Sequence, residues 1–422
     1  MLITRAPKGT RDILPDESYR WQYIERVMRE VCKRYHFREI RIPTFEHTEL
    51  FLRGVGETTD IVNKEMYTFE DKGGRSITLK PEGTAGVARS FLQNNLFAEP
   101  MPQKMYYLYS PVFRYERPQA GRLREHHQFG VELYGAQGAA ADAEVISLAE
   151  MVLRTLGITN LELNINSIGC SKCRPVYNKA LVDYLSGNLS VMCGTCRERS
   201  VKNPLRILDC KVDSCRRIVG NAPRTIDHLC DDCNNHFREL KRHLDALGIR
   251  YIVNPMIVRG LDYYTRTVFE IISSGIGAQD TVCGGGRYDN LIEEVGGDPT
   301  PAVGFGMGME RLLLAMENCG AGFPAPDFPE LYIAAIGEDA LVEATRMASV
   351  LRQSGRTVDI ELTGRSLKAQ MKYADKMKYR FVAVIGDEEI ASRTLTVKNM
   401  QDGTEIKTGF DELPETLEDM LK

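Results

Sequence analysis

The sequence predicts an α+β protein in which an antiparallel sheet, flanked by helices and interrupted by a small cysteine-rich insertion, precedes a C-terminal α/β domain. Strand-like segments follow one another without crossover helices in two parts of the chain, which favours antiparallel pairing. The segment that holds most of the cysteines separates these two parts. A proline-rich stretch, residues 323–329, then precedes a regular alternation of strands and helices.

The elements of the sheet follow from hydrophobic periodicity. Residues 21–35 carry apolar side chains at helical spacing, which predicts an amphipathic helix near the N-terminus. Apolar and alternating runs predict strands at residues 105–114, 128–134, 161–166, 251–257, 268–272 and 303–305. Beyond the proline-rich linker, a parallel sheet is predicted from strands at 331–336, 357–360 and 381–385 and helices at 340–353 and 366–377.

These patterns divide the chain of 422 residues into domains, as expected for a length beyond one compact core. The first domain is predicted in two parts, residues 1–167 and 249–322. Between them lies the insertion, residues 168–248, whose two edges should lie close together in the parent fold. Residues 330–422 form the C-terminal domain.

Composition sets limits on the function. With 43% apolar residues the chain can bury a sizeable core, and the net charge of −4 does not suggest a general polyanion binder. No apolar run is long enough to span a bilayer, so no membrane association is expected. The N-terminal stretch 1–5 lacks the apolar segment of a signal peptide, and we expect a cytoplasmic protein.

One predicted helix of the C-terminal domain is basic. Lys368, Lys372 and Lys376 are four residues apart and therefore share one helical face. That face could bind RNA phosphates, in which case binding should weaken with salt. The alternative is an ordinary solvated helix face.

Eight of the 11 cysteines fall within the insertion, in four couples: Cys170 and Cys173, Cys193 and Cys196, Cys210 and Cys215, and Cys230 and Cys233. Two couples complete a tetrahedral thiolate site, so four suffice for two structural Zn²⁺ ions. The couples can combine in three ways, which the sequence does not decide. Free thiols are the alternative, since disulfides are rare in a reducing compartment. The insertion also carries 15 Lys or Arg against 9 Asp or Glu from residue 170 to 250, which favours contact with RNA.

An arginine-rich turn follows the strand predicted at 105–114. Residues 113–124 place four arginines and Glu116 in a segment broken by Pro118 and Gly121. Guanidinium groups stay charged and offer several N–H donors, so they suit triphosphate oxygens. Glu116 could accept a hydrogen bond from an exocyclic amine such as that of adenine. The alternative is a basic surface hairpin.

A second segment supports a nucleotide site. Residues 303–308 form a glycine-punctuated strand that runs into a helix, with Arg311 in its first turn. Glycines allow a ligand to approach the backbone closely, and a helix N-terminus favours anions. Neither a Walker loop nor a dinucleotide-binding fingerprint occurs in the chain.

Together these segments resemble motifs 2 and 3 of the class II aminoacyl-tRNA synthetases, and residues 41–46 resemble motif 1, which forms the dimer interface in that family. Residues 259–270 and 284–289 resemble the two signature motifs of histidyl-tRNA synthetases, and residues 7–12 and 79–84 match that family too. The resemblance implies the class II antiparallel sheet, a homodimer, and an anticodon-binding domain at 330–422. It implies an enzyme that ligates L-histidine to tRNA(His) through an ATP-dependent adenylate.

The resemblance also implies a histidine pocket. Such a pocket must pair the imidazole nitrogens and the α-ammonium, and polar contacts of this kind reject analogues strongly. Glu82, Thr84 and Gln128 would hold the ammonium, and Glu132 and Tyr264 would face the imidazole. The full predicted set is Glu82, Gly83, Thr84, Arg114, Gln128, Glu132, Arg259, Tyr263 and Tyr264. The alternative for the two tyrosines is ordinary packing beside a strand.

The predicted ATP site comprises Arg114, Glu116, Arg122, His126 and Arg311. Arg114 and Arg259 would grip the α-phosphate from opposite sides as the catalytic residues, and Arg122 and Arg311 would hold the β- and γ-phosphates with bridging Mg²⁺. His126 stands where class II motif 2 often has a phenylalanine that stacks on adenine. A neutral imidazole can stack there, whereas a protonated one would repel the neighbouring arginines.

Two rival functions remain open at this stage. Some bacteria carry a paralogue of histidyl-tRNA synthetase that regulates ATP phosphoribosyltransferase, lacks the anticodon-binding domain and loses ATP-binding arginines. This chain keeps Arg114, Arg122, Arg259 and Arg311 together with residues 330–422, which favours the enzyme. The other rival is a class II ligase for another amino acid, such as proline or threonine, and residues 259–264 argue against it.

Overall fold

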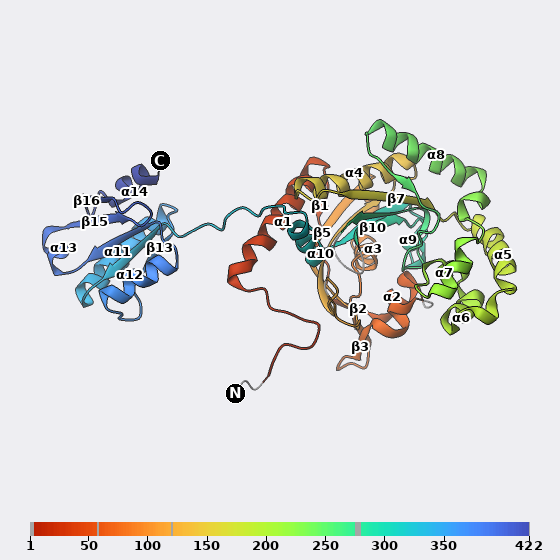
Figure 1. The fold of residues 1–422 in the computed structure, drawn as a ribbon, viewed down its shortest axis with the longest axis horizontal. Coiled ribbons are helices and arrows are strands. Elements are labelled where there is room, and N and C mark those ends of the chain that lie inside the picture. Colours follow the sequence, from red (N-terminus) through yellow and green to blue (C-terminus); the bar gives the residue numbers. More distant parts are fainter. Residues whose placement is uncertain (1–3, 57–58, 120, 275–279, 422) are drawn as a thin grey trace. The chain divides into compact units, whose positions relative to one another are not determined.

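The structure, a computed structural model, describes residues 4–56, 59–119, 121–274 and 280–421. Residues 1–3 of the N-terminal stretch and residue 120 of the arginine-rich turn therefore lie outside the described residues. The chain forms two compact units, Met1–Pro324 and Ala325–Lys422, each with its own apolar core (Figure 1). None of the helices in the described part of the chain has the length and apolarity to cross a membrane.

The first unit is built on an eight-stranded sheet with the strand order β1-β5-β6-β11-β10-β9-β7-β8. All neighbours pair antiparallel except β1 with β5 and β7 with β8, so the predicted antiparallel sheet is confirmed. Its strands are β1 Arg38–Glu39, β5 Gln103–Phe113, β6 Glu125–Tyr134, β7 Leu161–Ser167, β8 Ile252–Val253, β9 Thr265–Ser273, β10 Thr281–Arg287 and β11 Ala302–Gly308. The strand predicted at 251–257 shrinks to β8, because the chain turns at Asn254 and Pro255.

One face of this sheet carries the larger core. It packs against α1 (Pro15–Arg34), α4 (Ala139–Thr155), α8 (Asp231–Ala246) and α10 (Met309–Asn318). Helix α1 begins with Pro15, has acidic residues in its first turn and basic residues in its last, which suits the helix dipole. Its buried side chains recur every three or four residues and include Trp21, Ile24, Met28 and Val31.

The opposite face of the sheet carries a smaller core and leaves room for a site. It packs against α3 (Thr84–Gln93) and α9 (Leu291–Glu294). Because side chains alternate along a strand, the residues of β6 divide between the faces. Phe129 and Val131 enter the larger core, whereas Gln128 and Glu132 point to the other face. The strand period therefore places polar side chains on the side that is left open.

A second, three-stranded sheet was not predicted from the sequence. Strands β2 (Phe45–His47), β4 (Ser76–Leu79) and β3 (Tyr67–Glu70) pair antiparallel in the order β2-β4-β3. The strands are short and mostly exposed, so they lack a long apolar signature. Helix α2 (Thr48–Val55) follows β2, and β4 ends at Leu79, where residues 79–84 begin.

The cysteine-rich insertion is helical. It contains α5 (Cys173–Ser186), α6 (Gly194–Lys202), α7 (Asp213–Gly220) and α8, which packs on α4 and β9. Figure 1 shows α5, α6 and α7 grouped beyond the β7 end of the sheet. A small apolar cluster that includes Tyr177, Leu181 and Leu185 lies among these helices, together with Cys196 and Cys215. The insertion thus has a core of its own, to which cysteines contribute.

The second unit has a five-stranded sheet in the order β13-β12-β14-β15-β16. Strands β12 (Leu331–Ala335), β13 (Val358–Ile360) and β14 (Phe381–Ile385) are parallel, with α11 (Glu338–Gln353) and α12 (Leu367–Lys376) between them. The predicted parallel arrangement of these three strands is confirmed, and two strands that were not predicted, β15 (Thr394–Asn399) and β16 (Glu405–Gly409), extend the sheet with antiparallel pairing. A hairpin needs only a short turn, so no helix marked these strands in the sequence. Helices α13 (Asp387–Ser392) and α14 (Leu413–Leu421) complete the unit.

Candidate active site

A cavity of about 880 Å³ opens on the less covered face of the eight-stranded sheet. Most of the residues predicted for the histidine and ATP sites line it: Glu82, Thr84, Arg114, Glu116, Arg122, His126, Gln128, Arg259, Tyr263, Tyr264 and Arg311. Gly83 and Glu132 are not on its wall, but each contacts a residue that is. The Gly83 N–H donates to Gln128 Oε1 at 3.2 Å, and Thr84 Oγ1 donates to Glu132 Oε1 at 2.8 Å.

Two buried carboxylates mark one end of the cavity, with Glu82 on its wall and Glu132 hydrogen-bonded to Thr84 of the wall. Glu82 precedes α3, and its oxygens accept the N–H groups of Thr84 at 2.7 Å and Ala85 at 2.8 Å. A carboxylate at this place satisfies free donors of the first helical turn and suits the helix dipole. Glu132 is fully buried on β6, opposite Gly304 of β11, and a glycine there leaves space beside the carboxylate.

The electrostatics of this end are those of a site for a cation or N–H donor. Burial raises the pKa of Glu82, against the backbone N–H groups that lower it, and burial raises the pKa of Glu132 well above its usual range. Glu132 Oε2 has no hydrogen-bond partner among the described residues. A ligand bearing positive charge or an N–H group would stabilise both carboxylates in their ionised form. The aromatic wall beside them is formed by Tyr263, Tyr264 and Tyr288, with ring centroids 4.7–6.1 Å apart.

The other end of the cavity is rich in arginine. Arg114 follows β5, and its Nε donates to the Pro81 carbonyl at 2.8 Å, which fixes the side chain beside the segment that carries Glu82. Glu116 is buried and forms an ion pair with Arg122, with Arg114 Nη1 3.9 Å away. The pair uses Arg122 Nε and Glu116 Oε2, and a guanidinium has five N–H donors, so Arg122 can contact a phosphate without releasing Glu116.

Arg259 enters from the loop between β8 and β9. Its Nη1 donates to Glu270, and its guanidinium lies 5.8 Å from the centroid of the Tyr264 ring. Glu270 pairs in register with Gly284 of β10, and a Cβ on Gly284 would overlap the Arg259 guanidinium. Gly284 therefore leaves room for the Arg259 guanidinium in the position that it has here. Arg259 Nε has no hydrogen-bond partner within the described chain, so one donor is left for a ligand.

Arg311 and His126 complete the arginine-rich end. Arg311 is the third residue of α10, and it donates to the carbonyls of Gly121 at 3.1 Å and Thr281 at 3.0 Å. Burial, together with the charges of Arg114 and Arg311, lowers the pKa of His126 to about 3. The imidazole is therefore neutral near neutral pH, which is the form that can stack on a base among arginines.

Several residues on the cavity wall were not predicted from the sequence. Glu270 and Thr281 lie on adjacent strands, and Asp209, Lys211 and Arg216 come from the insertion. Alternation along β9 is a signal for Glu270, since Phe269 and Ile271 enter the larger core and leave Glu270 on the other face. No comparable signal exists for the insertion residues, whose place depends on tertiary packing.

The fold and cavity have the features of a class II aminoacyl-tRNA synthetase, with an antiparallel sheet and an arginine-lined site between motif 2 and motif 3. Comparisons with known proteins show which family of this class the chain belongs to. The family model for histidyl-tRNA synthetase matches residues 9–173 and 202–312, and that for an anticodon-binding domain matches residues 330–420. The chain belongs to the histidyl-tRNA synthetase family.

Relatives cover the chain almost end to end. It is 59% identical over 416 residues to the histidine–tRNA ligase of Caldanaerobacter subterraneus subsp. tengcongensis, covering 99% of this chain and 100% of that protein. It is 55% identical over 412 residues to the histidine–tRNA ligase of Acetivibrio thermocellus, covering 98% of this chain and 99% of that one. The crystal structure of apo S. aureus histidyl-tRNA synthetase matches with a TM-score of 0.83 and 38% identity, covering 98% of this chain and 100% of that chain.

Proposed function

We propose that this protein ligates L-histidine to tRNA(His), first forming histidyl-adenylate from histidine and ATP and then transferring the histidyl group to the 3′-terminal adenosine. The observation that carries the proposal is a single cavity lined by buried Glu82, by Thr84 with its hydrogen bond to buried Glu132, and by Arg114, Arg259 and Arg311. Anionic groups suit the ammonium and imidazole of histidine, and fixed guanidinium groups suit phosphate oxygens. The family relationship supports the same activity.

In the first step the histidine carboxylate attacks the α-phosphorus of ATP in line with the departing pyrophosphate. A new oxygen–phosphorus bond forms as the bond from that phosphorus to pyrophosphate breaks. Arg114 and Arg259 hold the α-phosphate from opposite sides and neutralise charge in the transition state. Glu132 and Tyr264 face the imidazole, and Glu82, Thr84 and Gln128 hold the ammonium. Alignment of the two substrates contributes much of the rate.

ATP enters this proposal as the Mg²⁺ complex. The Mg²⁺ that accompanies ATP would offset the charge of its phosphate oxygens. Arg122 and Arg311 hold the β- and γ-phosphates, and Arg122 does so with the N–H groups that are not paired with Glu116. Glu116 then accepts the adenine amine, and the neutral imidazole of His126 stacks on the ring.

The second step requires tRNA(His) as a partner. Residues 330–420 match an anticodon-binding domain, and the exposed Lys368, Lys372 and Lys376 of α12 offer a basic face for RNA phosphates. Lys211 and Arg216 of the insertion line the cavity, and their positive charge supports a contact with the phosphates of the acceptor end. Because ATP and tRNA are cytoplasmic substrates, the proposal includes a cytoplasmic location. The eight cysteines of the insertion are assigned a structural role with Zn²⁺.

A homodimer is part of the proposal. Residues 41–46 resemble motif 1, and within them Phe45 is 56% exposed in the single chain. An exposed aromatic side chain at this place fits a surface that a second copy covers. Light scattering coupled to size exclusion should give the mass of two chains, and a monomer at micromolar concentration would contradict this part.

Histidine-dependent ATP–pyrophosphate exchange tests the proposed activity. The purified protein should catalyse exchange with histidine and not with proline or threonine, and it should then charge tRNA(His). A regulatory paralogue would bind histidine without exchange. Exchange with another amino acid, or none with any, would overturn the proposal.

A further inference from the structure

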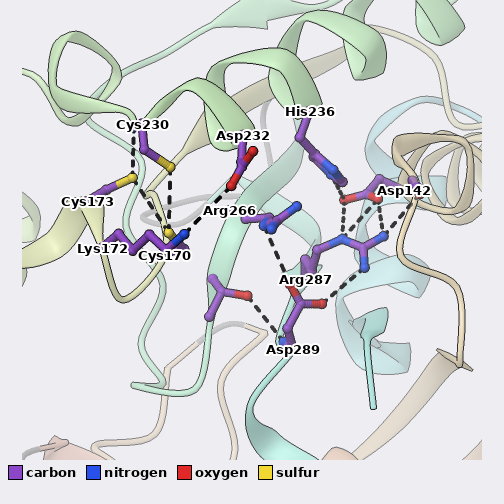
Figure 2. Close-up of polar contacts among 12 residues, drawn as sticks. Asp142, Cys170, Lys172, Cys173, Cys230, Asp232, His236, Arg266, Arg287 and Asp289 are labelled. Atoms are coloured by element: carbon purple, nitrogen blue, oxygen red, sulfur yellow. Dashed lines mark hydrogen bonds and ion pairs between the residues drawn. The ribbon is translucent and has the colours of Figure 1, made fainter. Parts of the chain in front are cut away.

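The eight cysteines of the insertion converge into two compact groups. One contains Cys170, Cys173, Cys230 and Cys233, and the other contains Cys193, Cys196, Cys210 and Cys215. Within each group all the sulfur atoms lie within 4.8 Å of one another. The first group joins the start of α5 to the start of α8, and Figure 2 shows Cys170, Cys173 and Cys230 turned toward one another. The second joins the start of α6 to α7 and the turn before it.

The spacing of the sulfur atoms fits thiolates around one ion. In a tetrahedral site with Zn–S bonds of about 2.3 Å, neighbouring sulfur atoms are about 3.8 Å apart. Cys170 Sγ lies 3.8 Å from Cys173 Sγ and 3.9 Å from Cys230 Sγ, and Cys193 Sγ lies 3.9 Å from Cys210 Sγ. A disulfide would bring two sulfur atoms to about 2.05 Å, and all eight cysteines are free.

Backbone groups around the sulfur atoms support the same arrangement. The Cys230 N–H donates to Cys173 Sγ at 3.1 Å, and the Cys193 N–H donates to Cys215 Sγ at 3.3 Å. Each group thus receives an N–H hydrogen bond from across the site, which stabilises negative charge on sulfur. Gly169 has a φ of +70°, and a Cβ there would overlap Cys173 Cβ, so a glycine lets the chain turn tightly before the first couple.

We propose that the insertion binds two Zn²⁺ ions, one at Cys170, Cys173, Cys230 and Cys233 and the other at Cys193, Cys196, Cys210 and Cys215. Four sulfur ligands complete the coordination of each ion, so both sites are structural and leave no position for a catalytic water. The pairing selects one of the three combinations that spacing alone allows. The inference concerns the insertion and stands apart from the proposed ligase activity.

The first ion would fasten the insertion where it leaves β7 and would hold the start of α8 at the same place. Arg174 follows the ligand Cys173 and donates through Nη2 to the Tyr264 carbonyl, on the wall of the cavity. The Arg266 N–H donates to the Gly169 carbonyl at 2.8 Å, next to Cys170. The site therefore links the first edge of the insertion and the start of α8 to the segment that carries Tyr263 and Tyr264.

The second ion would hold the part of the insertion that faces the cavity. Its ligand Cys210 lies between Asp209 and Lys211, and its ligand Cys215 precedes Arg216. Asp209, Lys211 and Arg216 all line the cavity. Metal at this site would thus act on catalysis by positioning these side chains rather than by touching substrate.

Metal content of the full-length protein tests the proposal. Protein purified under reducing conditions without added metal or chelator should carry two Zn²⁺ per chain by elemental analysis. Co²⁺ exchanged into the sites should give the intense visible bands of tetrahedral thiolate coordination. Cys319→Ser, outside both groups, should keep two ions. Iron in place of zinc, one ion per chain, or metal-free protein would overturn the two-site assignment.

Paired substitutions test which couples share an ion. The variant with Cys170, Cys173, Cys230 and Cys233 all changed to serine should lose one Zn²⁺ and keep the other. The variant with Cys170, Cys173, Cys193 and Cys196 changed to serine should lose both. The opposite result, with both ions lost in the first variant and one kept in the second, would refute the pairing. These readouts do not depend on activity, so a zinc-bound protein without exchange would reject the ligase proposal alone.

Discussion

Substitution of Arg259 should lower the rate of adenylate formation without abolishing histidine binding. In the proposed mechanism this arginine holds the α-phosphate, and its guanidinium donates to Glu270. Arg259→His should lower histidine-dependent exchange by about 10²-fold or more, since it removes stabilisation of transition-state charge, while histidine binding stays measurable by calorimetry. Exposed Arg250→His serves as the control and should keep full exchange. Equal loss of histidine binding and exchange would count against the assigned role.

The free energy of unfolding should depend on pH through His126, which lines the cavity. Its pKa is about 3 in the folded protein and about 6.5 in an unfolded chain, because burial and the nearby arginines disfavour the charged ring. Between these values the unfolded chain binds a proton that the folded protein does not. The free energy of unfolding therefore falls as pH decreases through this window, by up to about 1.4 kcal/mol per pH unit.

His126→Phe should remove this contribution and keep ATP binding, since a phenyl ring can also stack on adenine. Trp21, the sole tryptophan of the chain, is buried in the first unit and reports its unfolding by urea. Compared with the unsubstituted protein, the variant should lose less stability from about pH 7 to about pH 5. Identical pH profiles would show that His126 takes up its proton in the folded state.

Single residues also show what the sequence could and could not predict. Arg114, Arg259 and Arg311 stand in contiguous motifs, so their types and spacing marked them, and the structure brings them to one cavity. Their catalytic and binding roles stay predictions. Glu270 and Lys211 were missed because one depends on strand register and the other on how the insertion packs.

Among the elements, α4, β10 and α8 meet at one buried ion pair. Arg287 donates to Asp142 on α4, and both side chains are fully buried (Figure 2). His236 of α8 lies 3.4 Å from the same carboxylate. Although burial opposes it, Arg287 and His236 hold the pKa of Asp142 well below its usual range. The contact ties the last helix of the insertion to the sheet.

Asp142→Asn should destabilise the first unit by about 1.5–3 kcal/mol, because buried Arg287 loses its ion pair with Asp142 and keeps only the one with Asp289 at 3.1 Å. Urea unfolding followed by Trp21 fluorescence measures the change. The exposed Asp183 on α5 offers a matched control, and Asp183→Asn should change stability by less than about 0.5 kcal/mol. A loss no greater in Asp142→Asn than in the control would show that the ion pair does not stabilise the junction.

Elements were predicted well where their hydrophobic signal is long. Helix α1 and strands β5, β6, β9 and β14 appear where periodicity placed them, with ends shifted by a few residues. Strands β2, β3 and β16 were missed because they are short and largely exposed, so few apolar positions mark them. The antiparallel pairing of β15 and β16 could not be predicted, because the alternation of strands and helices in this part of the chain indicates parallel strands.

The molecule consists of two units with separate cores. In the proposed reaction the first unit forms the histidyl-adenylate, and the second unit contributes to binding of the tRNA. A chain ending at residue 324 should fold and retain histidine-dependent exchange, since every cavity residue lies in the first unit. Its charging of tRNA(His) should fall by about 10²-fold or more in kcat/KM, because one of two linked binding modules is lost. A truncated protein that is folded but inactive in exchange, or one that charges tRNA at full rate, would contradict this division.

The central claim is that guanidinium groups hold the phosphates of ATP beside a pocket for imidazole. A crystal structure of the protein with histidinol and ATP tests it most directly, because histidinol lacks the carboxylate that reacts. The account predicts the α-phosphate between Arg114 and Arg259, and the imidazole donating to Glu132. Arginine side chains turned away from the phosphates, or an imidazole bound elsewhere, would contradict it.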